Sequence, residues 1–262
     1  MTKVLILAAG QGSRLRPLTN DLPKCLVPFM GKSLLERQIS TLNKAGLKDI
    51  HIATGYKSEK IQELGYTTSF NPNYDKTNMV ESLFSAIAFI EEAKHKDEDL
   101  IIAYGDIFYQ LSNLNALLAC NDDLALMIDK DWEKLWRLRF ENPLDDAESL
   151  KLDAEGFVLE LGKKAKSVTE IQGQYTGLIK VASDKIQDLI NFYYDIDRKA
   201  QYDGQDFYNM YMTSFLQQLI DNGWKAKAAL VNNGWLEIDS VDDLNSYETM
   251  AKDGSLSTYI EI

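Results

Sequence analysis

The chain has 262 residues, of which 45% are hydrophobic and 26% are charged, as is typical of a soluble globular protein with a real core. The 28 Lys and Arg against 40 Asp and Glu give a formal net charge of -12 at pH 7, which argues against a nucleic-acid or anionic-membrane partner. Two cysteines and two histidines do not match a Cys/His metal cluster, and no apolar stretch approaches the roughly 18 residues of a membrane span, so we expect a cytoplasmic protein.

The first half of the chain alternates strand-like and helix-like patterns. The apolar run at residues 3–8 predicts a strand that is buried on both faces. Residues 33–45 carry a helical apolar stripe, with Ser33 and Glu36 as a capping box and Gly46 as a stop. Further predicted elements are strands at 49–55 and 65–70, a helix at 79–93 and a strand at 99–106. This order predicts βαβ units and a mostly parallel sheet.

The second half is more mixed and predicts a smaller, partly antiparallel region. Short strands are expected at 124–130, 137–142, 148–153, 156–164 and 174–182. They are followed by helices at about 184–195 and 205–221, strands at 226–231 and 234–239, and a closing helix from Ser240. No repeat or linker divides the chain, so we expect a single domain.

Three segments of the first half are expected to meet at one edge of the sheet. Right-handed crossovers place the carboxyl ends of parallel strands together, and ligands of open α/β sheets bind there. The loop at Gly10, the pair Gly55–Tyr56 and the pair Gly105–Asp106 all follow predicted strands. A ligand site at this edge is therefore expected.

The loop after the first strand has the composition of an anion-binding loop, although its spacing is neither that of a Walker A loop nor that of a dinucleotide fingerprint. Gly10 and Gly12 allow backbone N–H groups to approach an anion closely. Arg14 adds a bidentate donor for phosphate oxygens, and Lys24 follows behind Pro23.

Acidic residues at two places are candidate metal ligands. Asp106 ends a buried strand at the ligand edge, and Glu237 and Asp239 alternate along a short strand, so they face the same side. Such carboxylates suit Mg²⁺ bound to nucleotide phosphates. The alternative is that Asp239 or Ser240 caps the last helix, whose first turn would hold Asp242 and Asp243 to match the helix dipole.

The stretch LAAGQGSRLRPLTNDLPKCLVP at 7–28 resembles the signature of the nucleotidyltransferases that activate sugar phosphates and phosphocholine, and the resemblance extends over essentially the whole chain. It implies a Rossmann-like nucleotidyltransferase fold in one domain, 1–262, in which 1–120 mainly bind the NTP, 121–235 mainly bind the acceptor, and 236–262 supply the second metal acid and the closing helix. It implies that Arg14 and Lys24 stabilise the transition state at the α-phosphorus and the leaving pyrophosphate. The implied metal is Mg²⁺ on Asp106, Glu237 and Asp239. The implied nucleotide-binding residues of the loop and the strand ends are Leu7, Ala8, Ala9, Gly10, Gly12, Ser13 and Gly105.

Residues 71–83 resemble the corresponding stretch of the bacterial phosphocholine cytidylyltransferase group rather than that of the sugar-nucleotide enzymes. Asn78 and Ser82 are one helical turn apart, so both could address one base edge, and an amide with a hydroxyl suits cytosine. This favours CTP over UTP or dTTP. The alternative is that Asn78 simply caps the following helix.

The acceptor is expected to meet the central segment, which also resembles that group. Trp132 and Trp136 are candidates for an aromatic wall that binds a cationic head group, with core packing as the alternative. Either Arg137 or Arg139 could pair with an acceptor carboxylate or phosphate. Further acceptor-binding candidates are Lys163, for the acceptor phosphate, and Tyr175, on the strand that lines the pocket. Phosphocholine, a phosphorylated amino acid such as phosphoglutamine, and an aminoalkylphosphonate all remain open.

Together these features predict an enzyme that transfers CMP from CTP to a small phosphorylated acceptor and releases pyrophosphate, for the decoration of surface polysaccharides. The alternatives are a UTP- or dTTP-dependent sugar-1-phosphate nucleotidyltransferase and a non-enzymatic nucleotide-binding scaffold or sensor. A homodimer is one reading of the aromatic cluster at 192–215, beside an acceptor rim and plain core.

Overall fold

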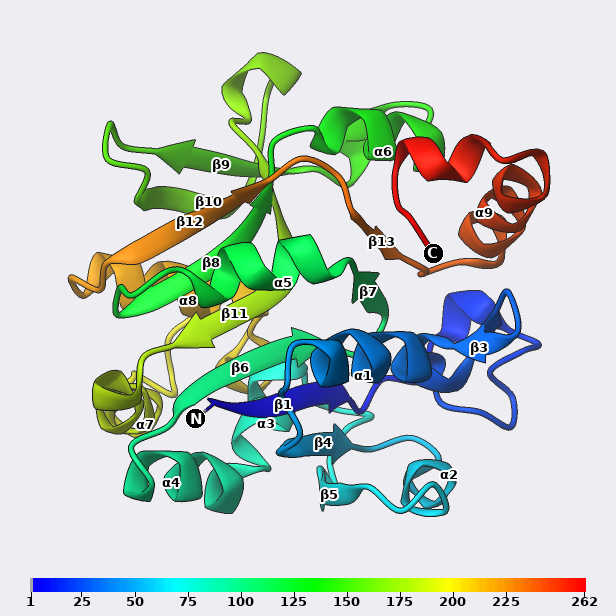
Figure 1. Cartoon of the computed structure of the whole chain (residues 1–262). Coiled ribbons are helices and arrows are strands. Elements are labelled where there is room, and N and C mark those ends of the chain that lie inside the picture. The colour runs from blue at the N-terminus through cyan, green and yellow to red at the C-terminus, as the bar shows by residue number, and fades with distance from the viewer. Residues whose placement is uncertain (1) are drawn as a thin grey trace.

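The computed structural model describes residues 2–262, which are built around one seven-stranded sheet (Figure 1). Its strand order is β12-β8-β11-β6-β1-β4-β5. The strands are β1 (Thr2–Ala8), β4 (Ile50–Thr54), β5 (Thr67–Phe70), β6 (Asp99–Tyr104), β8 (Leu124–Asp129), β11 (Gln174–Val181) and β12 (Ala226–Val231). Neighbours pair in parallel except for β11, which runs antiparallel to both β6 and β8. The predicted α/β fold with a mostly parallel sheet is confirmed.

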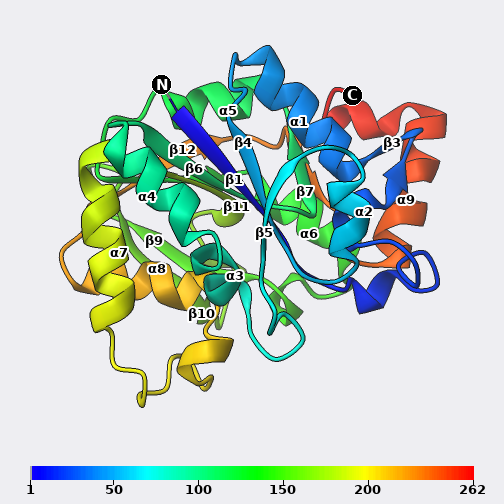
Figure 2. The ribbon, with the colours of Figure 1, turned by 90° about the horizontal axis from the view of Figure 1, so that it is seen from below.

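Helices cover both faces of this sheet, and the alternation of side chains along β1 explains its continuous apolar run. Val4 and Ile6 belong to one core cluster, and Leu5 and Leu7 belong to the other. The first cluster is covered by α1 (Leu34–Lys44), α5 (Leu111–Leu118), α6 (Trp132–Arg139) and α9 (Val241–Asp253). The second is covered by α3 (Met79–Phe84), α4 (Ile87–His95), α7 (Ile186–Asp195) and α8 (Met212–Asp221). Figure 2 shows α1 and α5 on the opposite side of the strands from α4 and α7.

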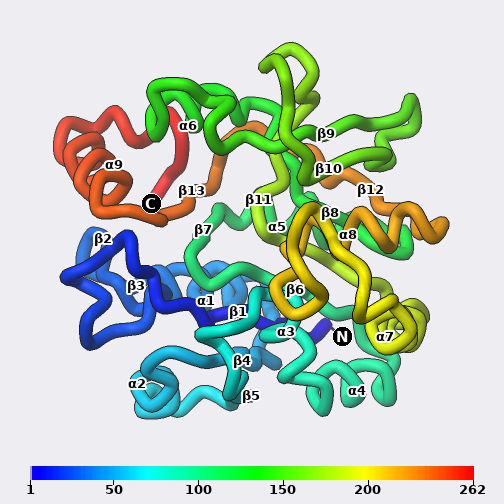
Figure 3. The backbone as a smooth tube through the Cα atoms, turned by 180° about the vertical axis from the view of Figure 1, so that it is seen from behind, coloured from blue at the N-terminus to red at the C-terminus, as the bar shows by residue number. Residues whose placement is uncertain are grey.

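Three small two-stranded sheets complete the fold, together with the short helix α2 (Ser58–Gln62). They pair β2 (Pro28–Phe29) with β3 (Lys32–Ser33), β7 (Ile107–Tyr109) with β13 (Trp235–Glu237), and β9 (Glu148–Leu152) with β10 (Val158–Lys164). In Figures 1 and 3 the closing helix α9 lies beside β2 and β3, so the last part of the chain returns to the first. No helix within residues 2–262 is both long and apolar enough to cross a membrane.

Most predicted elements are present, and the helix α1 begins at the predicted capping box of Ser33 and Glu36. The single helix expected at 79–93 is wrong, because it is interrupted between α3 and α4. There the Ser85 hydroxyl donates to the Ser82 carbonyl oxygen at 2.7 Å, and Ala86 leaves the helical region.

Two further element predictions are wrong in the second half of the chain. No strand forms at 137–142. Residues 137–139 are the end of α6, in which Trp132, Leu135 and Trp136 form a helical stripe that faces the core. The helix expected at 205–221 begins only at Met212, after a 3-10 turn at Phe207–Asn209.

Candidate active site

The glycine loop follows β1 and is shaped around Lys24. Gly12 has a φ of 62°, in the left-handed region that favours glycine, and a Cβ there would lie 2.9 Å from Lys24 Cβ. The Thr19 hydroxyl donates to the Gly12 carbonyl oxygen at 2.8 Å and closes the loop, while Leu15 is fully buried beneath it. Glycine at position 12 therefore lets the lysine stem pass directly behind the loop.

A second close approach fixes Asp106 beside the loop. The Gly105 N–H donates to the Leu7 carbonyl oxygen at 2.9 Å, and a Cβ on Gly105 would lie only 2.7 Å from the same oxygen. The end of β6 is therefore packed against the end of β1 with no space for a side chain. This contact places the carboxylate of Asp106 at the mouth of the glycine loop.

The three predicted metal acids meet at this place. Carboxylate oxygens of Asp106, Glu237 and Asp239 lie within 4.8 Å of one another. The pairing of β13 with β7 brings them together, because Glu237 is in register with Ile107 and the Ile238 N–H donates to the Asp106 carbonyl oxygen at 3.2 Å. Sequence reasoning did not predict β7, although it did predict that these acids share a site.

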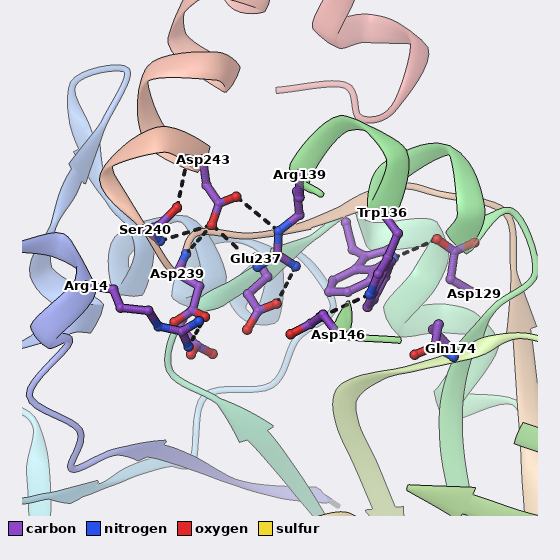
Figure 4. A network of polar contacts seen from close by, with 12 residues as sticks. Arg14, Asp129, Trp136, Arg139, Asp146, Gln174, Glu237, Asp239, Ser240 and Asp243 are labelled. Carbon is purple, nitrogen blue, oxygen red and sulfur yellow. Dashed lines mark hydrogen bonds and ion pairs between the residues drawn. The ribbon is translucent and has the colours of Figure 1, made fainter. Parts of the chain in front are cut away.

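The two predicted cations of the loop also reach this cluster. Lys24 Nζ lies 2.6 Å from Asp106 Oδ2 and 2.5 Å from Asp239 Oδ1, and the guanidinium of Arg14 pairs with Asp239 (Figure 4). Burial alone would lower the pKa of Lys24, but the carboxylates of Asp106, Glu237 and Asp239 outweigh it and raise that pKa. Burial would raise the pKa of Asp239, and its contacts with Lys24 and Arg14 hold that pKa below its ordinary value instead.

Arg139 contributes a third cation, from the far side of the cluster. Its Nη1 donates to Glu237 Oε2 at 2.7 Å, and its Nε donates to Asp243 Oδ1 at 3.1 Å. Burial raises the pKa of Glu237, and the Arg139 guanidinium opposes that rise. Asp243 and Ser240 form the capping box that begins α9, so the predicted capping role of Ser240 is confirmed.

The donor set fits a divalent cation such as Mg²⁺. It consists of three carboxylates, which are hard oxygen ligands. In addition, Asp106 Oδ1 is buried and finds no hydrogen-bond partner among residues 2–262, so one oxygen of the cluster is left for a ligand. The three side chains are suitable ligands for Mg²⁺, and the binding of Mg²⁺ stays a prediction.

A pocket opens between this cluster and α3. Its lining includes seven predicted nucleotide-binding residues, namely Leu7, Ala8, Ala9, Gly10, Asn78, Ser82 and Gly105. Gly12 and Ser13 lie in the adjoining loop. Tyr74, Thr77 and Tyr104 also line the pocket and were not predicted, although Tyr74 and Thr77 fall within the stretch 71–83 that carries the family resemblance.

The side chains of Asn78 and Ser82 are already engaged within the protein. Asn78 Oδ1 accepts from the Met79 N–H at 2.8 Å and caps α3, as the alternative interpretation holds, and its Nδ2 donates to the Asn209 carbonyl oxygen at 3.3 Å. Ser82 Oγ accepts from Asn71 Nδ2 at 3.1 Å. A role of either side chain in reading the base stays a prediction.

The structure corrects two of the predicted acceptor contacts. Trp136 is buried, its Nε1 donates to Asp146 Oδ2 at 3.0 Å, and its ring packs against Trp132 and Trp235, so the tryptophans belong to the core and form no exposed aromatic wall (Figure 4). The side chain of Arg139 is only 3% exposed and is paired with carboxylates, so it is not available to an acceptor.

The other two predicted acceptor residues remain candidates. Lys163 is exposed on β10. The ring of Tyr175 meets that of Tyr104 edge-on at 5.8 Å, and Tyr104 lines the nucleotide pocket. Tyr175 Oη is buried, and nothing in the described part of the chain forms a hydrogen bond with it.

Glu148 is a residue of this region that sequence reasoning did not single out. It begins β9, and its backbone N–H donates to Gln174 Oε1 at 3.1 Å. Burial, and then the nearby charge of Asp146, raise the pKa of Glu148 to about 7. The only sequence signal was the acidic run 145–148, which by itself does not distinguish a buried acid from exposed ones.

Comparison with known proteins identifies the family. A family model described as Nucleotidyl transferase matches residues 3–128. CTP:phosphoglutamine cytidylyltransferase of Campylobacter jejuni is 43% identical over 247 residues, which covers 92% of this chain and 96% of that protein. The chain belongs to the nucleotidyl transferase family. The resemblance noted from the sequence is thus confirmed.

Two other cytidylyltransferases are also similar to this chain, one in the sequence of a shorter stretch and one in the fold. Choline-phosphate cytidylyltransferase of Streptococcus pneumoniae is 43% identical over 86 residues, or 31% of this chain and 38% of that protein. The structure of CTP:phosphocholine cytidylyltransferase from Streptococcus pneumoniae superposes with a TM-score of 0.69 at 21% identity, over 95% of this chain and 99% of that one. At this identity the superposition supports the fold alone.

Proposed function

We propose that this protein is a Mg²⁺-dependent cytidylyltransferase, which transfers CMP from CTP to a small phosphorylated acceptor and releases pyrophosphate. The observation that carries the proposal is the 43% identity with a CTP:phosphoglutamine cytidylyltransferase, because it extends over 92% of the chain and so includes both the nucleotide and the acceptor regions. A phosphorylated amino acid is therefore the first acceptor class to test. Phosphocholine has weaker support, since the choline-phosphate relative matches only 31% of the chain.

The chain's own residues supply positioning and positive charge for this reaction. Arg14 and Lys24 lie at the acid cluster beside the glycine loop, where they would neutralise the charge that develops on the α-phosphoryl group and the pyrophosphate. An oxygen of the acceptor phosphate forms a bond to the α-phosphorus while the bond from that phosphorus to the bridging oxygen breaks, and the electron pair leaves with pyrophosphate. A phosphate is already ionised near pH 7, so no general base is required.

Asp106, Glu237 and Asp239 would hold the metal ion. When it is bound, Mg²⁺ supplies further neutralisation of the phosphate charges of the nucleotide. The ammonium of Lys24, which contacts two of these carboxylates in the structure, would then be available to the triphosphate. The proposal also includes a cytoplasmic location and a role in the decoration of surface polysaccharides. A homodimer stays one reading of the aromatic cluster at 192–215.

The test is pyrophosphate release with a panel of NTPs and phosphorylated acceptors. We expect turnover with CTP, loss of turnover in Asp106→Ala, and no loss in Asp184→Asn, a change at an exposed acid. Faster turnover with UTP or dTTP and a hexose 1-phosphate would establish the sugar-nucleotide alternative. Binding of CTP without turnover of any acceptor would instead indicate a sensor or scaffold.

A further inference from the structure

Arg139 is a buried cation with a defined set of acidic partners that come from the other end of the chain. It is the last residue of α6, its side chain is 3% exposed, and its carboxylate partners lie 98 and 104 positions further along the chain. Nη1 is 2.7 Å from Glu237 Oε2, while Nε is 3.1 Å from Asp243 Oδ1 and Nη2 is 3.4 Å from Asp243 Oδ2. This forked arrangement orients both acids, which a single ammonium could not do.

The second partner, Asp243, extends this grip to the backbone of the acid cluster. Asp243 Oδ2 accepts from the N–H groups of Asp239 and Ser240, at 3.0 Å each, and the Asp243 N–H donates to Ser240 Oγ at 3.0 Å. The guanidinium therefore holds Glu237 directly and the backbone of Asp239 through one intermediate. Figure 4 shows Arg139 between Glu237 and Asp243, with Asp239 and Ser240 on the far side of Asp243.

Aromatic packing fixes the position of the guanidinium itself. Its central carbon lies 5.2 Å from the ring centroid of Phe140 and 5.8 Å from that of Trp136, and the indole of Trp136 is tied to Asp146. The side chain therefore has contacts on the α6 side as well as on the acid side. A residue built into the core in this way is suited to orient its partners and is unsuited to follow a substrate.

We propose that Arg139 is a positioning residue, which holds Glu237 and, through Asp243, the backbone of Asp239 in the arrangement that binds a divalent cation together with Asp106. The inference rests on the metal-dependent function proposed above. Partners that orient metal-binding side chains from behind typically contribute 10- to 100-fold to metal affinity. Replacement of Arg139 should therefore weaken metal binding by about that factor.

The test is titration of Mn²⁺, without acceptor, into the full-length protein in the presence of CTP, with free Mn²⁺ followed by electron paramagnetic resonance. We expect Arg139→Met to bind Mn²⁺ about 10- to 100-fold more weakly than the wild type. Arg139→Lys, which keeps the charge but loses the fork, should fall between the two. The matched control is Lys134→Met, because Lys134 is on the same helix but is 60% exposed and pairs with Asp131.

Turnover gives an independent readout, since excess Mg²⁺ should restore much of the kcat of Arg139→Met and leave the KM for the acceptor near the wild-type value. Unchanged Mn²⁺ affinity in both Arg139 variants, or a raised acceptor KM that Mg²⁺ does not correct, would overturn the proposal. Should Arg139→Met fail to fold, Arg139→Lys alone decides the question by the same titration. A wild type that binds Mn²⁺ with CTP but turns over no acceptor would contradict the proposed function and still leave this inference testable.

Discussion

Replacement of Lys24 by Met should destabilise the metal-free protein far more than most single substitutions of a lysine. The ammonium contacts two carboxylates at 2.6 and 2.5 Å, and the three side chains are 13%, 21% and 13% exposed, so the cluster is largely removed from water. Removing one partner of a buried ion pair typically costs about 3–5 kcal/mol, because the remaining charges stay buried without compensation. For a chain of this size that corresponds to a fall in Tm of roughly 6–20 °C.

The same reasoning predicts how metal changes the effect. A divalent cation that binds the three acids replaces the missing positive charge, and a ligand that binds only the folded state stabilises it. Mg²⁺ should therefore raise the Tm of Lys24→Met by more than it raises that of the wild type. Turnover should stay about 10²–10³-fold below that of the wild type even with Mg²⁺, because the variant lacks the cation that the proposed function assigns to the phosphates.

The assay is thermal unfolding in EDTA and then in a series of MgCl₂ concentrations, with Lys48→Met as the matched control at an exposed lysine. A Tm for Lys24→Met within about 2 °C of the wild type in EDTA would show that the ammonium does not balance these acids. Equal stabilisation of both proteins by Mg²⁺ would show that the metal does not bind where the lysine contacts the acids.

Three further outcomes follow from the site. Arg14→Ala should lower kcat by about 10²–10³-fold but shift the Tm by only about 2 °C, because the Arg14 side chain is 64% exposed and its ion pair is accessible to solvent. A large loss of Tm would contradict this. Glu148→Gln should remove a pH dependence of stability, because the pKa of Glu148 is about 7 in the folded protein and 4.5 ordinarily. The wild type should lose roughly 3 kcal/mol of stability relative to the variant as the pH rises from 4.5 through 7, and an equal pH dependence of the two proteins would refute this. Gly105→Ala should cost about 1–3 kcal/mol and lower kcat, because its Cβ would lie 2.7 Å from the Leu7 carbonyl oxygen, and a fully active, equally stable variant would exclude this constraint.

The parts of the site that could be predicted from the sequence depend on local spacing. The glycines and Arg14 fall in one short loop after a strand, and alternation along the predicted strand at 234–239 puts Glu237 and Asp239 on one face, although β13 itself ends at Glu237. Asp106 could be placed beside the glycine loop because ends of parallel strands share an edge, whereas its grouping with Glu237 and Asp239 rests on the family resemblance. The strand period and the connection rule are local, so the sequence carries them by itself, but the pairing of β13 with β7 that joins the three acids is not.

The predictions that failed concern side chains whose partners are distant in the chain. Whether Trp136 is exposed or buried depends on Trp235, which lies 99 residues away on β13. The strand predicted at 137–142 overlaps the end of α6, where the core-facing residues repeat with a helical period. The interruption of the helix at Ser85 depends on one serine that bonds to the backbone in place of the next helical turn. Neither contact leaves a periodic signal.

The role of Arg139 illustrates why the sequence misleads most at the charged residues of such a site. An arginine in a predicted acceptor segment suggests an anionic ligand. The three carboxylates of Asp106, Glu237 and Asp239 repel one another, however, so they also need nearby cations to stay together. The structure provides positive charge from three directions, through Lys24 and Arg14 on the nucleotide side and Arg139 behind. Arg14 and Lys24 lie beside the glycine loop, where the proposed function puts the phosphates, while the side chain of Arg139 is only 3% exposed. The burial of Arg139 distinguishes it from a residue that would meet substrate, and the local sequence does not encode that burial.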